Sequence, residues 1–558
     1  MNAEKEVIKL LNKELKLKGI SLEAPPDPKL GDFAFPCFQL SKKFKKNPVE
    51  ISKELSNKLK PSGLIKEIKQ AGPYLNFFID KQKLAESLIK EILRGDYGKG
   101  KAKKEKVMVE YSQANTHKAF HVGHLRGTCL GESLARILKY SGYNVIQANY
   151  QGDTGAHVAK WLWCYLKFHK GEKPPKKDPE RWIADIYVEA VKKSNQDNQK
   201  EIEKINYQLE NKKDKELMNL WKESRKWSLD ILDDIYKDLD AHFDKFFFER
   251  EVEARGKEIA EELVKKGIAK IDDGAALVDL EKYRLGIWIL LRKDGTCLYS
   301  AKDLALAEKK FKEFKIDKSI YVVGNAQNMH MQQLFKTLEL MKFKQAKKCF
   351  HLSYAMVRMP TGKMSSRTGE NILYLDLKNE IINKLKQEVE KRHKDWNSQQ
   401  KAESVLNIFS SAIKFDFLMQ DPNKDIIFDI EKALDFEGET GPYIQYVHAR
   451  ICSIFNKNGK FNGKFNAGML KTEYEEKIIN LLSAFPDTIE KSAESYKPHL
   501  IARYLIELSQ SFNEFYHNCP ILQADKDTKQ ARLGLISAVK EVIKTGLDLL
   551  GIESPEVM

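Results

Sequence analysis

The chain reads Val107-Met-Val-Glu-Tyr-Ser-Gln-Ala-Asn-Thr-His-Lys-Ala-Phe-His-Val-Gly-His124 and continues as Leu125-Arg-Gly-Thr-Cys-Leu-Gly-Glu-Ser-Leu-Ala-Arg-Ile-Leu138. Its first five residues form a short apolar run with the composition of a buried strand. From Leu125 onward, apolar residues recur at helical spacing, which predicts a helix. The loop between them ends at a helix N-terminus, where unpaired backbone N–H groups attract anions. The stretch therefore predicts a strand, a phosphate-binding loop and a helix.

The predicted loop contains three histidines, His117, His121 and His124. Gly123 stands between the last two, and its missing Cβ lets a flat ring lie against the backbone. Two histidines near a helix start are ordinary in themselves. The third completes no familiar zinc ligand set, because no cysteine or acidic cluster lies nearby. We therefore expect no protein-bound metal, and a phosphate-bearing ligand instead.

A second segment, far downstream, reads Met359-Pro-Thr-Gly-Lys-Met-Ser-Ser-Arg-Thr-Gly369. Its composition predicts a loop, and Lys363 and Arg367 are cations that can neutralise a polyphosphate. Alone, such a segment is most often a solvated surface loop. In this order, however, the two segments resemble the two signature motifs of class I aminoacyl-tRNA synthetases.

Other segments narrow this resemblance to one family. Glu110 to His124 resembles the first motif of arginyl-tRNA synthetases, with an acidic residue at the strand end and Asn115 and Lys118 ahead of the histidines. Three more segments are similar to segments of that family: Tyr299-Ser-Ala-Lys-Asp303, Tyr321-Val-Val-Gly-Asn-Ala-Gln327 and Gly441-Pro-Tyr-Ile-Gln-Tyr-Val-His-Ala-Arg450. The matches extend through most of the chain.

Two positions depart from the family pattern. His157 stands where many members carry Gln, and Ser366 stands where the fuller second signature carries another lysine. Either Arg367 or Lys118 can supply the missing positive charge, and the sequence does not choose between them.

The resemblance implies an α/β protein with a Rossmann-like class I synthetase catalytic domain built on a parallel sheet, over residues 105–400. It also implies a small N-terminal α+β domain (1–98), which contacts the tRNA elbow, and a C-terminal all-α anticodon-binding domain (405–558). The Gly- and Lys-rich segment 95–106 is expected to be a linker.

The residue pattern itself supports a parallel sheet. A second strand at Asn144–Asn149 completes a βαβ unit, whose right-handed crossover requires parallel strands. The sheet is expected to resume at Leu285–Leu291, Cys297–Tyr299 and Ser319–Val323. Charged residues with interleaved tryptophans predict a helical insertion at about 170–240.

Composition limits the classes of protein to consider. At 558 residues the chain should fold as several domains, and its 42% hydrophobic residues are enough for sizeable cores. The net charge of +15 favours a polyanionic partner, either nucleic acid or an anionic membrane surface. No apolar run is long enough to cross a bilayer and the start lacks a signal-peptide pattern, so we expect a cytoplasmic protein without a membrane partner. The seven scattered cysteines are expected to be reduced.

The resemblance further implies a reaction. Members attach L-arginine to tRNA(Arg) through an arginyl-adenylate, consume ATP carried with Mg²⁺, and release AMP and diphosphate. Such a transfer relies on positioned reactants and stabilised negative charge, so it requires no side-chain nucleophile. A monomer is expected.

Site roles are carried over by resemblance, residue by residue. The expected catalytic residues are His121, His124, Lys363, Lys118 and Arg367. The expected ATP-binding residues are His121, Gly123, His124, Lys363 and Ser365. The expected arginine-binding residues are Glu110, Asn115, Tyr299, Asp303 and Gln327. The expected anticodon-binding residues are Tyr443, Tyr446, Arg450, Tyr516 and Met558.

The chemistry of these side chains suits such roles. A guanidinium group needs planar acceptors, and Glu110 and Asp303 supply carboxylates. Asp303 also fits an ordinary acid in the first turn of a helix. Tyr443, Tyr446 and Arg450 share a helical face, which suits stacking on unpaired bases, although the tyrosines also fit core packing.

Three alternatives stay open at this stage. The chain could be a class I synthetase for another amino acid, such as cysteine or lysine, or a small nucleotidyltransferase with the same histidine motif. It could also be a non-catalytic tRNA-binding relative, which would bind tRNA without consuming ATP.

Overall fold

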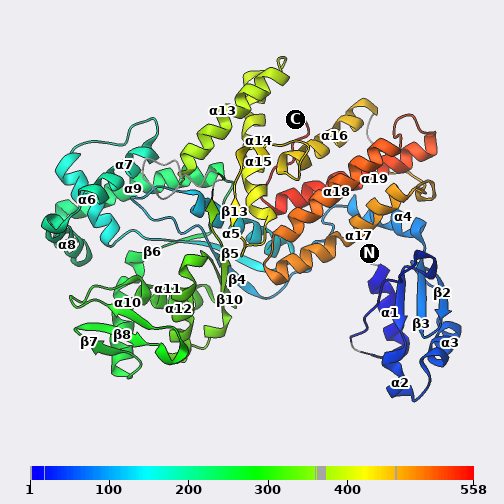
Figure 1. Cartoon of the computed structure of the whole chain (residues 1–558), viewed down its shortest axis with the longest axis horizontal. Helices are drawn as coiled ribbons and strands as arrows, with labels where there is room; N and C mark the ends of the chain where they lie inside the picture. Colours follow the sequence, from blue (N-terminus) through cyan, green and yellow to red (C-terminus); the bar gives the residue numbers. More distant parts are fainter. Residues whose placement is uncertain (1–2, 18, 359, 361–371, 459–460) are drawn as a thin grey trace.

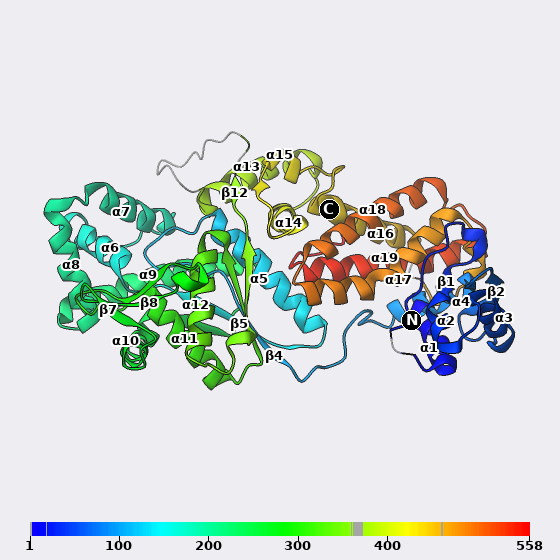
Figure 2. The same cartoon turned by 60° about the horizontal axis from the view of Figure 1, so that its bottom comes forward.

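The computed structural model describes residues 3–17, 19–358, 360, 372–458 and 461–558. Lys363, Ser365, Ser366 and Arg367 of the second motif lie outside these residues. The described chain forms three parts, with the N-terminal part and the helical insertion at opposite ends of the molecule (Figures 1 and 2).

The N-terminal part is a small α+β unit. Its three strands form an antiparallel sheet in the order β1-β3-β2. Its elements are α1 (Ala3–Leu15), η1 (Pro28–Leu30), β1 (Phe33–Pro36), α2 (Phe38–Phe44), α3 (Pro48–Lys58), β2 (Ile65–Ala71), β3 (Tyr74–Ile79) and α4 (Lys81–Ile92). The apolar face predicted for the first helix is buried, with Val7 and Leu11 fully inside.

The segment expected to be a linker connects α4 to β4 without a helix or strand of its own, and it is packed against the C-terminal helices. Tyr97 is buried, and its hydroxyl donates to the carbonyl of Leu482 at 3.0 Å. The Gly100 N–H donates to the Tyr140 carbonyl at 2.8 Å. Gly and Lys content does not reveal that one buried tyrosine fixes the segment.

The middle part is built on a five-stranded parallel sheet in the order β11-β10-β4-β5-β6, which confirms the predicted fold class. The strands are β4 (Lys106–Glu110), β5 (Asn144–Gln151), β6 (Lys245–Phe248), β10 (Lys318–Gly324) and β11 (Cys349–Tyr354). The helices and turns that accompany them are α5 (Val122–Tyr140), α10 (Glu249–Lys265), α11 (Tyr299–Phe314), η3 (Asn325–Gln327), α12 (Asn328–Leu340) and η4 (Ala346–Lys348). Ligands in such sheets bind at the carboxyl ends of the strands.

Two predicted strands of this sheet are absent from it. Leu285–Leu291 contributes β9 (Ile287–Leu291) to a separate antiparallel sheet with β7 (Lys270–Asp272) and β8 (Ala275–Asp279), next to the turn η2 (Glu281–Tyr283). Trp288 and Leu290 are buried while Ile287 and Ile289 are exposed, the alternation of a half-buried antiparallel strand. Cys297 forms only an isolated bridge, and Tyr299 begins α11.

The helical insertion is present and lies between β5 and β6. It consists of α6 (Ala156–Phe168), α7 (Pro179–Lys193), α8 (Gln196–Asn211) and α9 (Lys215–Asp238). The helices enclose a core of their own around Trp161 and Trp221. Of the tryptophans interleaved with the charges, Trp221 is therefore a core residue, and Trp182 and Trp227 pack against this core.

After the sheet the described chain becomes helical. Two short strands, β12 (Val357–Arg358) and β13 (Ile426–Ile427), pair with each other. The helices and turns are α13 (Tyr374–Arg392), α14 (Ser398–Met419), α15 (Ile430–Ala433), α16 (Gly441–Asn458), η5 (Ala467–Met469), α17 (Glu473–Ser495), α18 (His499–Asn518) and α19 (Lys526–Leu549). Within the described residues, none of the helices combines the length and apolar character that crossing a membrane requires.

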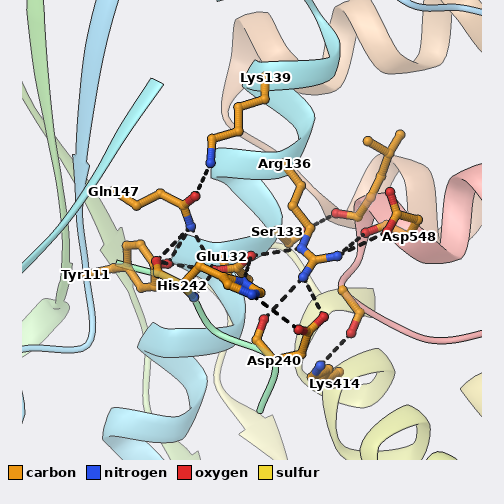
Figure 3. A network of polar contacts seen from close by, with 12 residues as sticks. Tyr111, Glu132, Ser133, Arg136, Lys139, Gln147, Asp240, His242, Lys414 and Asp548 are labelled. Atoms are coloured by element: carbon orange, nitrogen blue, oxygen red, sulfur yellow. Dashed lines mark hydrogen bonds and ion pairs between the residues drawn. The ribbon is translucent and has the colours of Figure 1, made fainter. Parts of the chain in front are cut away.

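Helix α5 joins the sheet to the C-terminal helices through a polar network (Figure 3). Arg136 contacts Glu132 one turn earlier, Asp240 beyond α9 and Asp548 near the end of α19, at 2.8, 2.6 and 3.1 Å. The Ser133 hydroxyl donates to the Leu549 carbonyl at 2.9 Å. The helix that begins at the histidine motif is therefore anchored directly to α19.

Candidate active site

A cavity of about 860 Å³ lies where β4 and β10 end and α5 and α11 begin. It is bordered by every described residue that the sequence assigned to arginine or ATP binding: Glu110, Asn115, His121, Gly123, His124, Tyr299, Asp303 and Gln327. The structure thus brings together side chains from three separate segments of the chain.

The two motif histidines form a stacked pair at the start of α5. Their ring centroids are 3.8 Å apart, and His121 is the N-cap residue. Nδ1 of His121 accepts from the Gly123 N–H at 3.1 Å, and Nδ1 of His124 accepts from the His121 N–H at 3.4 Å. A Cβ at position 123 would lie 2.9 Å from the His121 ring, so the pair requires glycine there.

Both histidines are neutral at pH 7. Burial, reinforced by Lys118, lowers the pKa of His121 to about 4, and burial lowers the pKa of His124 well below its ordinary value. Since each Nδ1 accepts a backbone hydrogen bond, each Nε2 carries the ring proton. The pair can therefore donate two N–H groups to ligand oxygens beside the positive end of the α5 dipole.

Asp303 borders the cavity from the first turns of α11. Its Oδ2 accepts from Nε2 of His330 at 2.6 Å, and Nδ1 of His330 accepts from the Trp288 indole at 3.3 Å. The Tyr299 ring packs against His330, with centroids 4.7 Å apart, and Tyr299 itself is 55% exposed. This chain of contacts fixes the direction of the Asp303 carboxylate and leaves its second oxygen to accept from a ligand.

Glu110 borders the cavity too, but its carboxylate is paired with Lys310 of α11. Lys310 is fully buried, and its ammonium lies 3.9 Å from the centroid of the Tyr321 ring. The sequence prediction took no account of this internal cation. Glu110 therefore carries a charge that is already neutralised within the protein.

The sequence analysis missed Glu249, a third carboxylate at the cavity. It begins α10 directly after β6, and its Oε2 lies 2.9 Å from Nζ of Lys302. A recognisable signal was present, because an acidic residue directly follows the Phe246-Phe-Phe248 run. The carboxyl end of a parallel strand is where ligand-binding residues are expected.

Asn115 is held by the chain that follows β5. Its Oδ1 accepts from the Gly152 N–H at 3.1 Å, and a Cβ at Gly152 would lie 2.4 Å from that oxygen. Glycine at 152 is therefore required for this contact. The arrangement leaves the Asn115 amide NH₂ as a donor at the cavity wall.

Lys118 is placed differently from the other predicted residues. Its ammonium lies 5.2 Å from the centroid of the Tyr187 ring of α7, in a small cleft beside Phe120 and Glu180. It is half-buried, and burial lowers its pKa. The side chain thus lies beside the histidine pair, on the side of the helical insertion.

A second cavity of about 860 Å³ lies among α13, α14, α16 and α18. It is bordered by Tyr443, Tyr446, Arg450 and Met558, and the Arg450 guanidinium lies over the rings of Tyr446 and Tyr516, at 4.7 and 5.5 Å. Tyr446 and Tyr516 are each 39% exposed, whereas Tyr443 is 8% exposed and accepts from Asn513. Core packing thus describes Tyr443 better than it describes the other two.

The C-terminal tail is guided into this second cavity by α16. Gln445 donates to the Glu553 carbonyl at 2.8 Å, and Nδ1 of His448 lies 2.9 Å from the Pro555 carbonyl. These contacts bring Met558, the last residue, to the cavity that holds Tyr446 and Arg450.

The parallel sheet, the histidine pair at the start of α5 and the C-terminal helical bundle together define a class I aminoacyl-tRNA synthetase. Three family models match the chain: tRNA synthetases class I (R), catalytic domain, over 87–430; DALR anticodon binding domain, over 444–558; and arginyl tRNA synthetase N terminal domain, over 2–79. The chain belongs to the arginyl-tRNA synthetase family.

Individual relatives agree over nearly full length. The arginine–tRNA ligase of Bdellovibrio bacteriovorus is 38% identical, with 96% of this chain and 94% of the relative covered. That of Clostridioides difficile is 36% identical, with 100% and 98% covered. The solved arginyl-tRNA synthetase of Thermus thermophilus superimposes with a TM-score of 0.82 at 27% identity and covers 100% of this chain and 99% of its own.

Proposed function

We propose that the cavity at the ends of β4 and β10 carries out the reaction of this family, the ATP-dependent attachment of L-arginine to tRNA through an arginyl-adenylate. One observation carries the proposal. The fixed carboxylate of Asp303 and the neutral histidine pair border the same cavity. The cavity thus offers an acceptor for a guanidinium group and donors for phosphate oxygens.

At the arginine end, Asp303 receives the guanidinium, and Glu249, whose carboxylate is paired with Lys302, borders the same cavity. A guanidinium binds carboxylates through parallel N–H bonds, which select for geometry as well as charge. Tyr299 covers this end of the cavity. Asn115 and Gln327 bind the α-amino and carboxylate groups, which leaves the carboxylate directed toward ATP.

At the ATP end, Nε2–H groups of His121 and His124 donate to phosphate oxygens, and Gly123 admits the adenine. Mg²⁺ enters with ATP and neutralises part of the phosphate charge. Lys363, Ser365 and Arg367 complete this end, as the resemblance implies. Lys118 adds a cation beside the histidine pair. Whether Lys118 or Arg367 supplies the positive charge missing at Ser366 stays a prediction.

The reaction follows from this placement. The arginine carboxylate attacks the α-phosphorus of ATP and diphosphate leaves with its electron pair. The 3′-terminal adenosine hydroxyl of tRNA then attacks the acyl carbon, and AMP leaves. The protein positions the reactants and stabilises dispersed negative charge, which is enough for large rate effects.

The direct test is charging of unfractionated tRNA with each of the twenty amino acids in turn, in the presence of ATP and Mg²⁺. Acid-precipitable label from arginine alone is the expected result. Charging with another amino acid would refute the arginine end of the cavity. Retained tRNA binding without any charging would favour a non-catalytic relative.

The second cavity is proposed to receive anticodon bases. Tyr446 and Tyr516 offer exposed rings on either side of Arg450, an arrangement on which unpaired bases stack. Tyr443 supports these side chains through Asn513, and Met558 forms the apolar wall. The N-terminal part contacts the tRNA elbow. A cytoplasmic location and a monomeric state stay predictions of the sequence.

Replacing Tyr446 by Ala is expected to raise KM for tRNA roughly 5- to 100-fold, the loss of one base–aromatic contact. The KM values for arginine and ATP should stay within about twofold of wild type, since the cavity of α16 lies apart from that of β4. Tyr207→Ala is the matched control, because Tyr207 is a tyrosine of similar exposure on α8, 46% against 39% for Tyr446. An unchanged KM for tRNA in Tyr446→Ala would remove this residue from the RNA surface.

A further inference from the structure

The loop before the histidine pair is held in an unusual backbone conformation. Ser112, Gln113 and His117 have φ values of 76°, 47° and 60°, in the left-handed region that side chains other than glycine disfavour. Asn115 lies between these residues, and His121 follows them. Such a loop keeps its shape only where its surroundings determine it.

Helix α9 of the helical insertion supplies that support through His117. The His117 N–H donates to the Ser228 hydroxyl at 3.0 Å, and Nε2 of the ring lies 2.9 Å from the Ser224 hydroxyl. Nδ1 lies 2.9 Å from the Thr116 hydroxyl. The side chain is fully buried, and burial lowers the pKa of His117 to about 3, so the ring is neutral. Since hydroxyls engage both ring nitrogens, His117 is a structural link and not a metal ligand.

The same helix also fixes the chain on the other side of Asn115. The Trp221 indole donates to the Asp153 carbonyl at 2.8 Å, and Nε of Arg225 donates to Oδ2 of Asp153 at 2.9 Å. Asp153 is buried and directly follows Gly152. Gly152 in turn donates to the Asn115 side chain and accepts from the Thr116 N–H at 3.0 Å.

One stretch of α9 therefore holds both backbone segments that enclose Asn115. Ser224 and Ser228 lie one helical turn apart, as do Trp221 and Arg225, so the four side chains point to one side of the helix. Figure 1 shows α9 running from the helical insertion toward the sheet. These contacts are polar and directional, whereas general packing of an insertion would need only its apolar core.

We infer that the helical insertion acts as a template for the active site, in which His117, held by Ser224 and Ser228, is a positioning residue for Asn115. The inference rests on the proposed role of Asn115 at the amino-acid end of the cavity. Loss of the hydroxyls frees the loop to relax toward ordinary backbone angles. A relaxed loop misplaces the substrate carboxylate, and a misplacement of about 1 Å can reduce a rate 100-fold.

The test compares Ser224→Ala/Ser228→Ala with wild type and with Ser194→Ala. Ser194 is a serine of the same insertion whose hydroxyl donates to the Val191 carbonyl, away from the loop. The double variant should raise KM for arginine about tenfold and lower kcat, because the His117 N–H then lies buried without an acceptor. The double variant should keep the wild-type KM for tRNA. The control Ser194→Ala should keep the wild-type melting temperature.

Two further variants separate positioning from simple destabilisation. His117→Asn should retain more activity than His117→Ala, because Asn tolerates the left-handed region and its amide can replace Nδ1 of the ring at the Thr116 hydroxyl. Wild-type arginine kinetics in the double serine variant, or equal activity of the Asn and Ala variants, would overturn the inference. Failure of wild type to charge arginine would instead refute the proposed function.

Discussion

Replacing Asp303 by Asn reduces kcat/KM for arginine roughly 100-fold or more, while KM for ATP stays within about twofold of wild type. A carboxylate inside a protein binds a guanidinium far more strongly than a neutral amide does, and breaking such a pair costs about 3–5 kcal/mol. The fold should survive the change. The Asn oxygen can still accept from His330, whose Nε2 carries the proton.

The measurement is steady-state charging of tRNA over a range of arginine concentrations. Citrulline, which has a neutral urea group in place of guanidinium, serves as a second substrate. Wild type should have a much higher kcat/KM for arginine than for citrulline. In Asp303→Asn the two kcat/KM values should lie closer together, since both substrates then meet a neutral side chain. An arginine KM equal to wild type in Asp303→Asn would exclude Asp303 as the acceptor.

Glu110→Gln is the informative comparison, because its carboxylate is already paired within the protein. The substitution leaves Lys310 buried without its counter-charge, so it should lower the free energy of unfolding by about 3–5 kcal/mol. The accompanying exchange Lys310→Met should restore much of that loss. If Glu110→Gln instead kept wild-type stability and lost arginine affinity, the two carboxylates would share the guanidinium.

The sequence was sufficient for the main architecture because local signals were strong. The apolar run before the histidine motif and the helical spacing after it correctly predicted β4 and α5. The strand predicted near residue 297 is absent, and the one predicted near residue 285 belongs to a different sheet, since a short apolar run does not reveal whether one or both of its faces are buried. Only the structure shows that Ile287 and Ile289 are exposed.

The parts of the site that escaped prediction depend on contacts between distant segments. Lys310 neutralises Glu110 across 200 positions, and no local pattern links the two. Lys118 lies over Tyr187 because α7 of the helical insertion packs beside the loop that precedes the histidine pair. The role of His117 likewise depends on Ser224 and Ser228, more than 100 positions away.

His124→Ala is expected to slow arginyl-adenylate formation about 100- to 1,000-fold, the usual effect of removing one preorganised donor to developing negative charge. KM for arginine should change little, because the stacked pair borders the phosphate end of the cavity. The measurement is arginine-dependent exchange of diphosphate into ATP, carried out with tRNA present. His169→Ala is the matched control, since His169 lies in the helical insertion with glutamates as its partners. A rate within threefold of wild type would show that His124 is not a donor in this step.

The pH profile distinguishes a neutral donor from a cation. The pKa of His124 is held well below 6.5 by burial, so the folded protein keeps the ring neutral across pH 6 to 8. The rate of adenylate formation should therefore not fall as the pH rises through 6.5, whereas an imidazolium donor would lose its proton there.

The lowered pKa of His124 also affects the stability of the protein. A histidine that is neutral when folded and titrates near 6.5 when unfolded contributes fully above pH 6.5, and its contribution falls as the pH drops toward the folded pKa. His124→Ala should for this reason unfold with a weaker dependence on pH below 6.5 than wild type.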